Sequence, residues 1–595
     1  MGFKNYILVC GGTGCESSRS DQIYRSLIEE AKAQGVEEQV QVIKTGCFGF
    51  CEQGPIVKIL PEDSFYVQVK PEDAKELISE HVVKGREVKR LLYDKTPRKP
   101  YEEVEDIPFY KKQLRVVLRN CGSIDPENID EYIAADGYKA LEKVLFEMTP
   151  DQVIEEMKTA GLRGRGGAGF PTWMKWNFTK QAEGDEKFVV CNADEGDPGA
   201  YMDRSTLEGD PHSVLEAMTI CGHTIGAHQG FIYIRAEYPL AIHRLEVAMK
   251  QAREYGLLGK NILGSGFDYD IEIRLGAGAF VCGEETALLQ SIEGHRGMPL
   301  PRPPFPAVKG LWGKPTVINN VETWANVPAI IAKGGAWFAS IGTADSHGTK
   351  VFALTGKICN SGLVEVPMGT TLREIVYDIG GGIAHGKKFK AVQTGGPSGG
   401  VITEENLDTP IDFGGLQKIG SMMGSGGMIV MDEDDCIVDV AKFYLNFTVD
   451  ESCGKCAPCR IGGKTLCNIL EKITNGNGTE EDIKQIKQVA QAMQKGSLCA
   501  LGQTSPNPVL STLRYFPEEY EAHIKEKKCP AGKCKKLISY QINPDKCIGC
   551  TACSRKCPVG AISGEVRKPH KINSSVCIKC GVCKETCKFS AIEIR

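Results

Sequence analysis

The chain has 595 residues, of which 42% are hydrophobic and 25% charged, so it is long enough for several domains and is not disordered in composition. A net charge of −5 lacks the excess of basic residues that is typical of nucleic-acid-binding proteins. No apolar run approaches the roughly 20 residues that span a bilayer. The 25 cysteines stand out. Because the short apolar N-terminus does not resemble a secretory signal, we expect a cytoplasmic protein whose cysteines are metal ligands more often than disulfides.

Residues 1–83 are predicted to alternate strands and helices. The expected strands are Asn5–Cys10, Val40–Lys44, Ile56–Leu60 and Phe65–Val69, and the expected helices are Asp21–Ala33 and Pro71–Val83. The four cysteines that follow the first two strands are Cys10, Cys15, Cys47 and Cys51. Four thiolates on neighbouring strand-end loops suit a [2Fe–2S] cluster, with zinc as the alternative. Residues 84–112 are rich in Lys, Arg, Glu and Pro and are predicted to be a linker.

Residues 113–345 mix helices and strands with many glycines, which predicts one large domain. A helix is expected at Pro150–Ala160, since Thr149 and Gln152 form a capping signature and Gly161 follows. The loop after it has a GxGxxG match, but this match follows a helix, so a Rossmann fold is not supported. The glycines would still let backbone N–H groups approach a phosphate or a flat ring, although a structural turn is the alternative. Positive charge there comes from Arg163, Arg165 and Lys175.

Residues 346–432 predict a small α+β module, with β-rich runs at Val351–Leu354 and Ala391–Gln393 around a helix at Thr371–Ile379. Residues 433–525 are predicted to be mostly helical. They contain a close cysteine triplet and a remote fourth cysteine, namely Cys453, Cys456, Cys459 and Cys499. This pattern fits a [4Fe–4S] site, with structural zinc as the alternative.

Residues 526–595 hold a cysteine run that repeats after 30 residues. In such runs three cysteines bind one cluster and the fourth reaches the other cluster. The spacing assigns Cys547, Cys550, Cys553 and Cys587 to one [4Fe–4S] cluster, and Cys577, Cys580, Cys583 and Cys557 to a second. The segment looks like a two-[4Fe–4S] ferredoxin, and paired zinc knuckles are the alternative.

Three further cysteines lie near these sites, and with one histidine they would complete a structural zinc site. We predict that the ligands are Cys467, His523, Cys529 and Cys534, with three free thiols as the alternative. The remaining cysteines stand singly and are expected to be buried small hydrophobes: Cys121, Cys191, Cys221, Cys282, Cys359 and Cys436.

Four segments of the large domain carry a close resemblance to a known family. They are Asn192–Arg204, Gly276–Thr286, Arg302–Pro306 and Gly313–Thr323. The region resembles the FMN- and NADH-binding subunit of respiratory complex I and its relatives in NAD-linked hydrogenases and formate dehydrogenases. The N-terminal part resembles thioredoxin-like [2Fe–2S] ferredoxins, and residues 346–432 are similar to a ubiquitin-like β-grasp (SLBB-type) insert. The implied fold class is multidomain α/β and α+β.

The resemblance implies a set of cofactor contacts. FMN would be bound by Gly164, Arg165, Gly166, Lys175, Asn192, Asp194, Glu195, Phe280, Gly283, Glu284, Asn319, Asn320 and Thr323. NAD would be bound by Phe170, Phe178, Glu285, Arg302 and Phe305. No side chain is expected to act as acid or base, because FMN carries the chemistry, and Glu195, Asp194 and Lys175 would position it. Glu285 at the adenosine ribose would favour NAD over NADP.

Two departures from the complex I branch keep the charge, since Asp197 replaces the usual glutamate and Arg302 a common lysine. The fusion of all these modules resembles the β subunit of NAD-dependent [FeFe] hydrogenases, including electron-bifurcating ones. The resemblance implies a diaphorase with FMN, NAD(H), one [2Fe–2S] and three [4Fe–4S] clusters, together with the zinc ion proposed from the residues. Its partners would be a catalytic α subunit, a small [2Fe–2S] γ subunit and ferredoxin. The alternatives are a formate dehydrogenase β subunit and an iron–sulfur wiring subunit without flavin activity.

Overall fold

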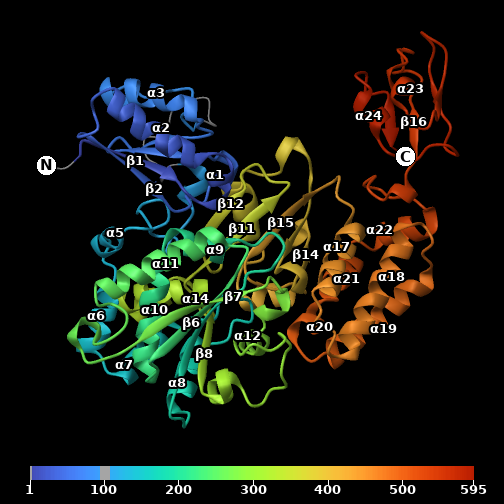
Figure 1. The fold of residues 1–595 in the computed structure, drawn as a ribbon. Coiled ribbons are helices and arrows are strands. Elements are labelled where there is room, and N and C mark those ends of the chain that lie inside the picture. The colour runs from blue at the N-terminus through green and yellow to red at the C-terminus, as the bar shows by residue number, and fades with distance from the viewer. Residues whose placement is uncertain (1–2, 94–106, 595) are drawn as a thin grey trace. The chain divides into compact units, whose positions relative to one another are not determined.

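A computed structural model describes residues 3–93 and 107–594 (Figure 1). The chain divides into two units: Met1–Met431 with Leu498–Leu501, and Asp432–Ser497 with Gly502–Arg595. The boundary at Met431 and Asp432 lies next to the predicted start of the helical domain at residue 433. Within the described ranges, no helix is both long and apolar enough to cross a bilayer.

The N-terminal part of the first unit is a four-stranded sheet in the order β2-β1-β3-β4. Its elements are β1 (Asn5–Cys10), α1 (Thr13–Ser17), α2 (Ser20–Ala33), β2 (Val40–Thr45), η1 (Cys51–Gln53), β3 (Val57–Leu60), β4 (Ser64–Tyr66) and a helical run at 71–83. Helix α2 buries Ile23, Leu27 and Ala31, which are four residues apart and therefore share one face. The predicted strands and helices of this part are confirmed, with boundaries shifted by a few residues.

The described ends of the predicted linker are packed against the protein. Val88 and Leu91 are buried with the core of the N-terminal sheet. Helix α4 (Pro108–Lys111) places the Phe109 ring on that of Phe50, with ring centroids 4.2 Å apart. These ends therefore belong to the folded core, whereas residues 94–106 of the predicted linker lie outside the described residues.

A parallel sheet in the order β7-β6-β5-β8 forms the centre of the large domain (Figure 1). Its strands are β5 (Phe188–Ala193), β6 (Gln229–Arg235), β7 (Asp270–Gly276) and β8 (Thr316–Asn320). The helices are α5 (Ile129–Ala134), α6 (Lys139–Glu147), α7 (Pro150–Ala160), α8 (Thr172–Gln181), α9 (Met202–Gly209), α10 (Pro211–Ile225), α11 (Pro239–Glu254), α12 (Glu285–Ile292), α13 (Pro306–Lys309), α14 (Val321–Lys333) and α15 (Gly335–Ala339). Helix α7 has the predicted bounds and the predicted capping box.

The α+β module is a mixed sheet in the order β12-β11-β15-β13-β14. Its strands are β11 (Thr349–Gly356), β12 (Gly362–Pro367), β13 (Phe389–Thr394), β14 (Gly400–Ile402) and β15 (Gly427–Asp432), accompanied by α16 (Phe413–Lys418). The helix predicted at Thr371–Ile379 is confirmed to within one residue: Leu372 and Arg373 are α-helical and continue directly into the π-helical segment η8 (Glu374–Ile379). The Thr371 hydroxyl bonds to the Glu374 carboxylate at 3.0 Å, which holds residues before η8 in a capping turn.

The second unit begins as a helical bundle and ends in a small repeated module. The bundle consists of α17 (Ile437–Asp450), α18 (Gly463–Thr474), α19 (Glu480–Gly496), α21 (Asn507–Tyr515), α22 (Pro517–Glu521) and η13 (Ala522–Glu526). The short helix α20 (Ala500–Thr504) has its first two residues in the first unit and the rest in the second. The module pairs β16 (Tyr540–Ile542) with β19 (Ile592–Ile594) and β17 (Ile562–Ser563) with β18 (Lys571–Ile572), and adds α23 (Ala552–Lys556) and α24 (Val582–Thr586). The two short helices, α23 and α24, are 30 residues apart in the chain, which is the period of the cysteine repeat.

Candidate functional site

Two strand ends form the base of the predicted flavin site. Strands β5 and β8 are parallel neighbours, so the pairing sets Asn192 opposite Asn320 at their carboxyl ends. Open parallel sheets bind ligands at this edge. The Asn192 amide donates to the Gly283 carbonyl at 2.9 Å, and the Asn320 side chain accepts from Thr323 N at 3.0 Å as the cap of α14. Four predicted FMN residues from distant parts of the chain are thus brought together.

Glu195 follows β5 and is 5% exposed. Its carboxylate accepts from the backbone N–H groups of Asp203 and Arg204 at 3.0 and 3.1 Å, at the start of α9. Burial raises the pKa of Glu195 to about 6, because these donors offset only part of the desolvation. Burial and the charge of Glu195 also raise the pKa of Asp203, whose carboxylate accepts from the Asn320 amide at 3.2 Å. Asp203, which was not among the predicted site residues, therefore links Glu195 to the cap of α14.

The glycine-rich loop covers the same edge of the sheet. A Cβ on Gly166 would lie 3.2 Å from Cβ of Asn320, so the loop backbone approaches this residue closely. The Arg165 side chain is buried and donates to three backbone carbonyls, at 3.0 Å to Thr349, 2.6 Å to His347 and 2.8 Å to Arg163. The guanidinium therefore fastens the glycine-rich loop, and the Arg165 backbone N–H donates to Thr323 Oγ1 at 2.8 Å. The contact of Arg165 with FMN stays a prediction.

The other predicted FMN residues have mixed surroundings. Glu284 caps α12 by accepting from Thr286 N and Ala287 N at 3.0 and 2.9 Å. Asp194 lies 3.8 Å from the Arg235 guanidinium. The Asn319 amide is buried and, in the orientation that satisfies both of its polar atoms, accepts from Trp176 Nε1 at 3.1 Å. Phe280 and Gly283 are the two ends of a short 3₁₀ segment, η6 (Phe280–Gly283), which directly precedes α12.

Three predicted NAD-binding phenylalanines keep much of their ring surface accessible, with exposed fractions of 42%, 44% and 55% for Phe170, Phe178 and Phe305. Accessible rings offer stacking surface to bases at low entropic cost. Beside them, Lys175 Nζ lies 3.2 Å and Arg302 Nη1 2.5 Å from the Glu285 carboxylate. Burial alone would raise the pKa of Glu285, but these two cations hold it below its ordinary value. Glu285 is therefore an anchored carboxylate at the predicted ribose position.

The four N-terminal cysteines come together as predicted. Cys10 interacts with both Cys15 and Cys47, and Cys47 interacts with Cys51. The hydrogen bond with Cys15, together with burial, raises the pKa of the Cys10 thiol well above its ordinary value. Cys10, Cys15 and Cys47 are buried, and Cys51 is exposed. Adjacent, largely buried thiols disfavour thiolates unless a cation balances them, so this donor set fits a bound iron cluster.

The cysteine triplet of the helical bundle lies between α17 and α18. Burial raises the pKa of the Cys459 thiol, and the nearby thiols of Cys456 and Cys453 raise it further. Ser452 Oγ lies 3.2 Å from Cys459 Sγ. Cys499 immediately precedes α20 in the chain. In that helix a Cβ on Gly502 would lie 2.8 Å from Cβ of Cys459, which explains the glycine at this position.

The tail brings its second predicted cluster set around one apolar cavity. The cavity is lined by Cys557, Cys577, Cys580 and Cys583, together with Tyr540 and Ile562. This set crosses the repeat, because Cys557 belongs to the first run and the other three to the second. An apolar cavity lined by these four cysteines fits a pair of [4Fe–4S] clusters in which each run supplies the fourth ligand of the other run's cluster.

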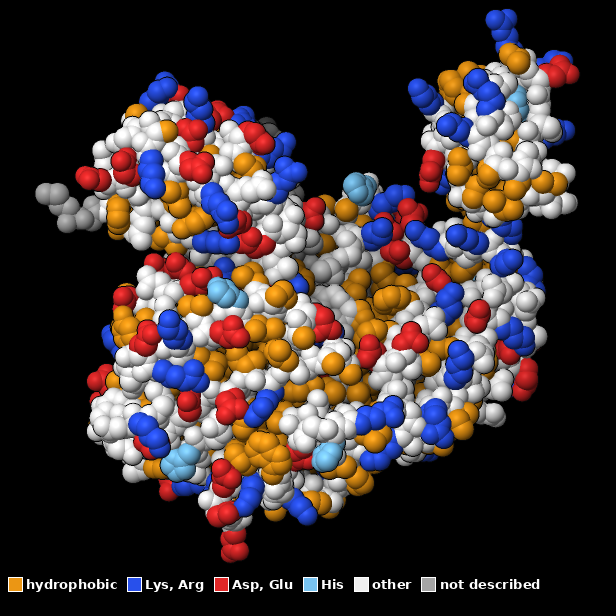
Figure 2. Space-filling view, in the orientation of Figure 1, with side chains coloured by type: hydrophobic (Ala, Val, Ile, Leu, Met, Phe, Trp, Pro, Cys, Tyr) orange, Lys and Arg blue, Asp and Glu red, His pale blue; other side chains and the backbone are white. Residues whose placement is uncertain are grey.

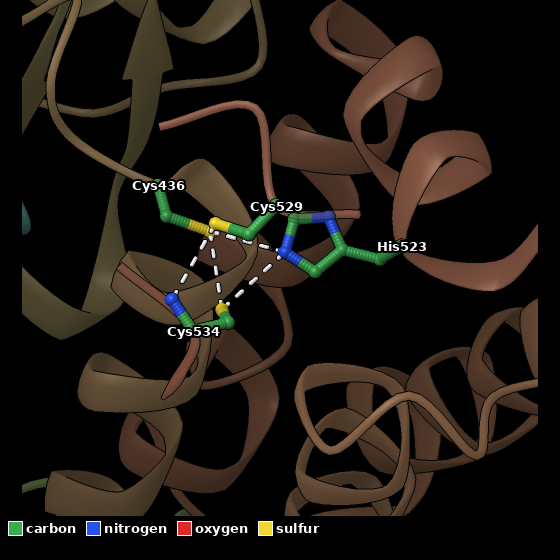
Figure 3. Close-up of side chains that lie close together, drawn as sticks. All are labelled: Cys436, His523, Cys529 and Cys534. Carbon is green, nitrogen blue, oxygen red and sulfur yellow. Dashed lines mark hydrogen bonds between the residues drawn. The ribbon is translucent and has the colours of Figure 1, made fainter. Parts of the chain in front are cut away.

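A further group of possible metal ligands in the second unit contains Cys436, His523, Cys529 and Cys534 (Figure 3). All four residues are buried, and their ligand atoms lie within 4.8 Å of one another. Cys436 precedes α17, His523 lies in η13, and the other two flank a loop before the tail. Three members were predicted, but the structure places Cys436 in the group and leaves Cys467 outside it, within α18. Cys436 lacks any spacing motif, so only tertiary structure could identify it.

The distances in this group match tetrahedral zinc. Cys436 Sγ and Cys534 Sγ are 3.7 Å apart, and His523 Nε2 lies 3.4 and 3.3 Å from them. Zn–S bonds of about 2.3 Å in a tetrahedron give S···S separations of ~3.8 Å. The Nδ1–H of His523 donates to the Glu519 carbonyl at 2.6 Å, which leaves Nε2 to face the sulfur atoms (Figure 3). Hydrogen bonds with Cys436 and Cys534 lower the pKa of Cys529, so a thiolate is favoured there.

Four family models match the chain. They are the thioredoxin-like [2Fe–2S] ferredoxin at residues 3–81, the Nuo51 FMN-binding domain at 157–329, the NADH-ubiquinone oxidoreductase-F iron–sulfur binding region at 439–523 and a 4Fe–4S binding domain at 540–563. Together they confirm FMN, [2Fe–2S] and [4Fe–4S] domains in the predicted order.

Whole proteins with known names are similar over most of the chain. The NADP-reducing hydrogenase subunit HndC of Solidesulfovibrio fructosivorans is 62% identical over 460 residues, which are 77% of this chain and 94% of that subunit. The NADH-quinone oxidoreductase F 2 subunit of Rhizobium meliloti (strain 1021) is 46% identical over 70% of this chain and 99% of its own. A crystal structure of an NAD⁺-reducing [NiFe]-hydrogenase in the H₂-reduced state matches 88% of this chain and 85% of that chain, with 29% identity and a TM-score of 0.62. This chain therefore belongs to the family of FMN- and iron–sulfur-binding subunits of NADH-quinone oxidoreductases and their hydrogenase counterparts.

Proposed function

We propose that this chain is the diaphorase subunit of a multi-subunit hydrogenase, exchanging a hydride between NAD(H) and FMN and single electrons with iron–sulfur clusters. The observation that supports the flavin chemistry is the edge of the sheet at β5 and β8. There Asn192 lies opposite Asn320, Asp203 bonds to both Glu195 and Asn320, and the glycine-rich loop approaches Asn320 closely. The similarity to HndC, which extends over 94% of that protein, favours a hydrogenase over a formate dehydrogenase complex.

The residues of this chain would bind and orient both cofactors. Bound FMN supplies the step that side chains cannot, because it accepts two electrons as a hydride and returns them singly. Asn320, Thr323 and the loop backbone at Gly166 would hold the flavin at the sheet edge. Phe178 and Phe305 would stack on the rings of the dinucleotide, while Glu285 would bind a ribose hydroxyl. Glu195 would position the flavin from the side of β5.

The clusters would be held by the predicted cysteines. We assign the [2Fe–2S] cluster to Cys10, Cys15, Cys47 and Cys51, and one [4Fe–4S] cluster to Cys453, Cys456, Cys459 and Cys499. The tail would bind two more, through the crossed sets described above. We further assign the five-stranded α+β module to the β-grasp type, whose mixed sheet it shares.

A content and activity measurement tests this function. Purified chain should carry one FMN and about 14 iron atoms, the sum of one [2Fe–2S] and three [4Fe–4S] clusters. It should also reduce a viologen dye with NADH, and with its partner subunits it should couple this activity to hydrogen. A chain that holds the iron but neither FMN nor NADH activity would instead be a wiring subunit. Activity that couples to formate rather than to hydrogen would identify a formate dehydrogenase.

We also propose that Cys436, His523, Cys529 and Cys534 bind one structural zinc ion. Such a site would join the segment before α17 to η13 and to the loop that leads into the tail. Because a closed Cys₃His shell leaves no open position, the ion would stabilise the fold and take no part in turnover.

Two matched cysteine variants test the zinc site. Cys436→Ser should lose the zinc measured by metal analysis and lower the thermal stability, since the remaining thiolates would stay buried without their cation. Cys467→Ser, which alters a buried cysteine outside the group, should keep the full zinc content. Loss of zinc from the Cys467 variant but not from the Cys436 variant would contradict the assignment.

The partners of this chain would be a catalytic α subunit and a small [2Fe–2S] γ subunit. Ferredoxin would be a further electron carrier, docked near the tail clusters. The similarity to a subunit of one hydrogenase and to a chain of another supports such a multi-subunit assembly.

A further inference from the structure

The loop that carries Cys47 and Cys51 is packed against the flavin domain and the α+β module. A Cβ on Gly46 would lie only 2.3 Å from Cα of Gly209, the last residue of α9, so the two backbones touch. On the other side, Leu363 N donates to the Gly49 carbonyl at 2.7 Å. The cysteine loop is therefore fixed in the first unit and is not an independent, freely exposed ferredoxin loop.

A tyrosine at the start of α9 reaches the cysteine sulfur. The hydroxyl of Tyr201, the residue before α9, donates to Cys51 Sγ at 3.8 Å. The guanidinium of Arg204, one turn along the helix, lies 5.7 Å from the centre of the Tyr201 ring and 5.4 Å from that of Tyr238. Cation–π contacts at these distances hold the ring of Tyr201 in place.

The same short segment contributes to the flavin site. The Glu195 carboxylate accepts from the backbone N–H groups of Asp203 and Arg204, within the first turn of α9. The Tyr238 hydroxyl donates to the Glu195 carbonyl at 2.9 Å. The helix start that positions Tyr201 is thus fixed by a residue proposed to contact FMN.

We propose that Tyr201 sets the reduction potential of the N-terminal [2Fe–2S] cluster by donating an O–H···S hydrogen bond to Cys51. Hydrogen bonds to cluster sulfurs are one of the levers by which proteins tune these potentials. Reduction adds one electron and so increases the negative charge on the sulfur ligands. A hydroxyl donor stabilises that charge and raises the potential. The inference rests on the proposed assignment of Cys10, Cys15, Cys47 and Cys51 as ligands.

A redox titration of the complete chain, followed by electron paramagnetic resonance of the [2Fe–2S] signal, tests the proposal. In Tyr201→Phe the ratio of reduced to oxidised cluster at a given potential should fall about tenfold, which is a shift of 59 mV for one electron. In D₂O the wild type should also show an exchangeable proton coupled to the cluster, and the variant should lack it. This second readout reports the hydrogen bond itself.

Tyr110→Phe is the matched control. Its hydroxyl donates to the Phe48 carbonyl at 3.0 Å, in the same loop, so this bond ends on a carbonyl oxygen and not on a cysteine sulfur. This variant should keep the wild-type potential and the exchangeable proton. An unchanged potential in Tyr201→Phe, or equal shifts in both variants, overturns the proposal, because loop packing rather than the O–H···S bond would then set the potential. Absence of any [2Fe–2S] signal in the wild type overturns the ligand assignment instead, and this inference with it.

Discussion

Single residues of the cofactor pocket act through partners that a linear sequence does not reveal. Arg165 lies in the glycine-rich loop, yet its guanidinium donates hydrogen bonds to backbone carbonyls of a distant segment, those of His347 and Thr349. Glu285, in contrast, has two side-chain cations as partners, Lys175 and Arg302, and its contact with the dinucleotide ribose stays a prediction. Because these cations neutralise much of its charge, Glu285 can discriminate against a 2′-phosphate less strongly than an isolated carboxylate would.

Removing the charge of Glu285 should change the choice of dinucleotide. In Glu285→Gln the ratio of kcat/KM for NADPH to that for NADH should rise about tenfold, because Lys175 and Arg302 would become available to a 2′-phosphate and the repelling carboxylate would be gone. The measurement is steady-state viologen reduction with each dinucleotide. Glu293→Gln, one residue beyond α12, should leave the ratio unchanged. An unaltered ratio in the Glu285 variant would remove this residue from the specificity site.

At the scale of elements, helix α10 shows how burial makes the flavin domain sensitive to acid. His212 in its first turn is 1% exposed, and its Nδ1 lies 2.9 Å from the Tyr138 hydroxyl. Burial lowers the pKa of His212 to about 4, below its value in an unfolded chain. The folded state therefore disfavours the protonated imidazole. The contribution of neutral, buried His212 to the free energy of unfolding is fully present above about pH 6.5, and it is lost as the pH falls towards 4.

The acid sensitivity should weaken when His212 is replaced. Between pH 8 and pH 5 the protonation of this residue costs the wild type about 2 kcal/mol of unfolding free energy. The temperature at which FMN is released, measured by flavin fluorescence, should therefore fall between pH 8 and pH 5. This fall should be smaller in His212→Asn than in the wild type. His243→Asn, at a side chain 58% exposed on α11, should behave like the wild type. Equal drops in all three proteins would show that other groups govern the acid response.

At the scale of the whole molecule, charge is distributed unevenly along the chain. Residues 541–595 contain ten Lys and Arg but four Asp and Glu, whereas the complete chain has a net charge of −5. Figure 2 shows Lys and Arg side chains at several points of the tail surface. Exposed apolar side chains lie among them, including Ile548, Ile578 and Phe589. A basic surface with apolar spots suits an acidic electron carrier, and a solvated basic face is the alternative.

Charge reversal in the tail should weaken turnover with an acidic ferredoxin. The double variant Lys556→Glu and Lys588→Glu should raise the KM for ferredoxin several-fold at low salt, because both lysines are exposed. The difference from the wild type should shrink at high salt, where charges are screened. The matched double variant Lys32→Glu and Lys250→Glu, outside the tail, should retain the wild-type KM. If ferredoxin turnover is the same in both double variants at low salt, the tail does not steer the carrier.

The local elements and the groups of regularly spaced cysteines could be predicted from the amino-acid sequence alone. Helix α7 begins at its capping box and the N-terminal strands occupy the expected residues, because capping and strand periodicity depend on neighbours in the chain. The cysteine sets proposed for the tail could be predicted for a related reason, because these cysteines recur at fixed short spacings. The cavity lined by Cys557 and the three cysteines of the second run agrees with that spacing.

Contacts between residues that are distant in the chain could be identified from the three-dimensional structure but not from the sequence. Cys436 joins His523 although they are 87 positions apart, and nothing in the sequence around it distinguishes this cysteine from the other solitary ones. The same holds for Tyr201 and Cys51, which lie in separate domains and touch through the packing of α9 on the cysteine loop. Such pairs depend on how whole elements pack, and the free energy of packing is shared among many contacts that leave no local pattern.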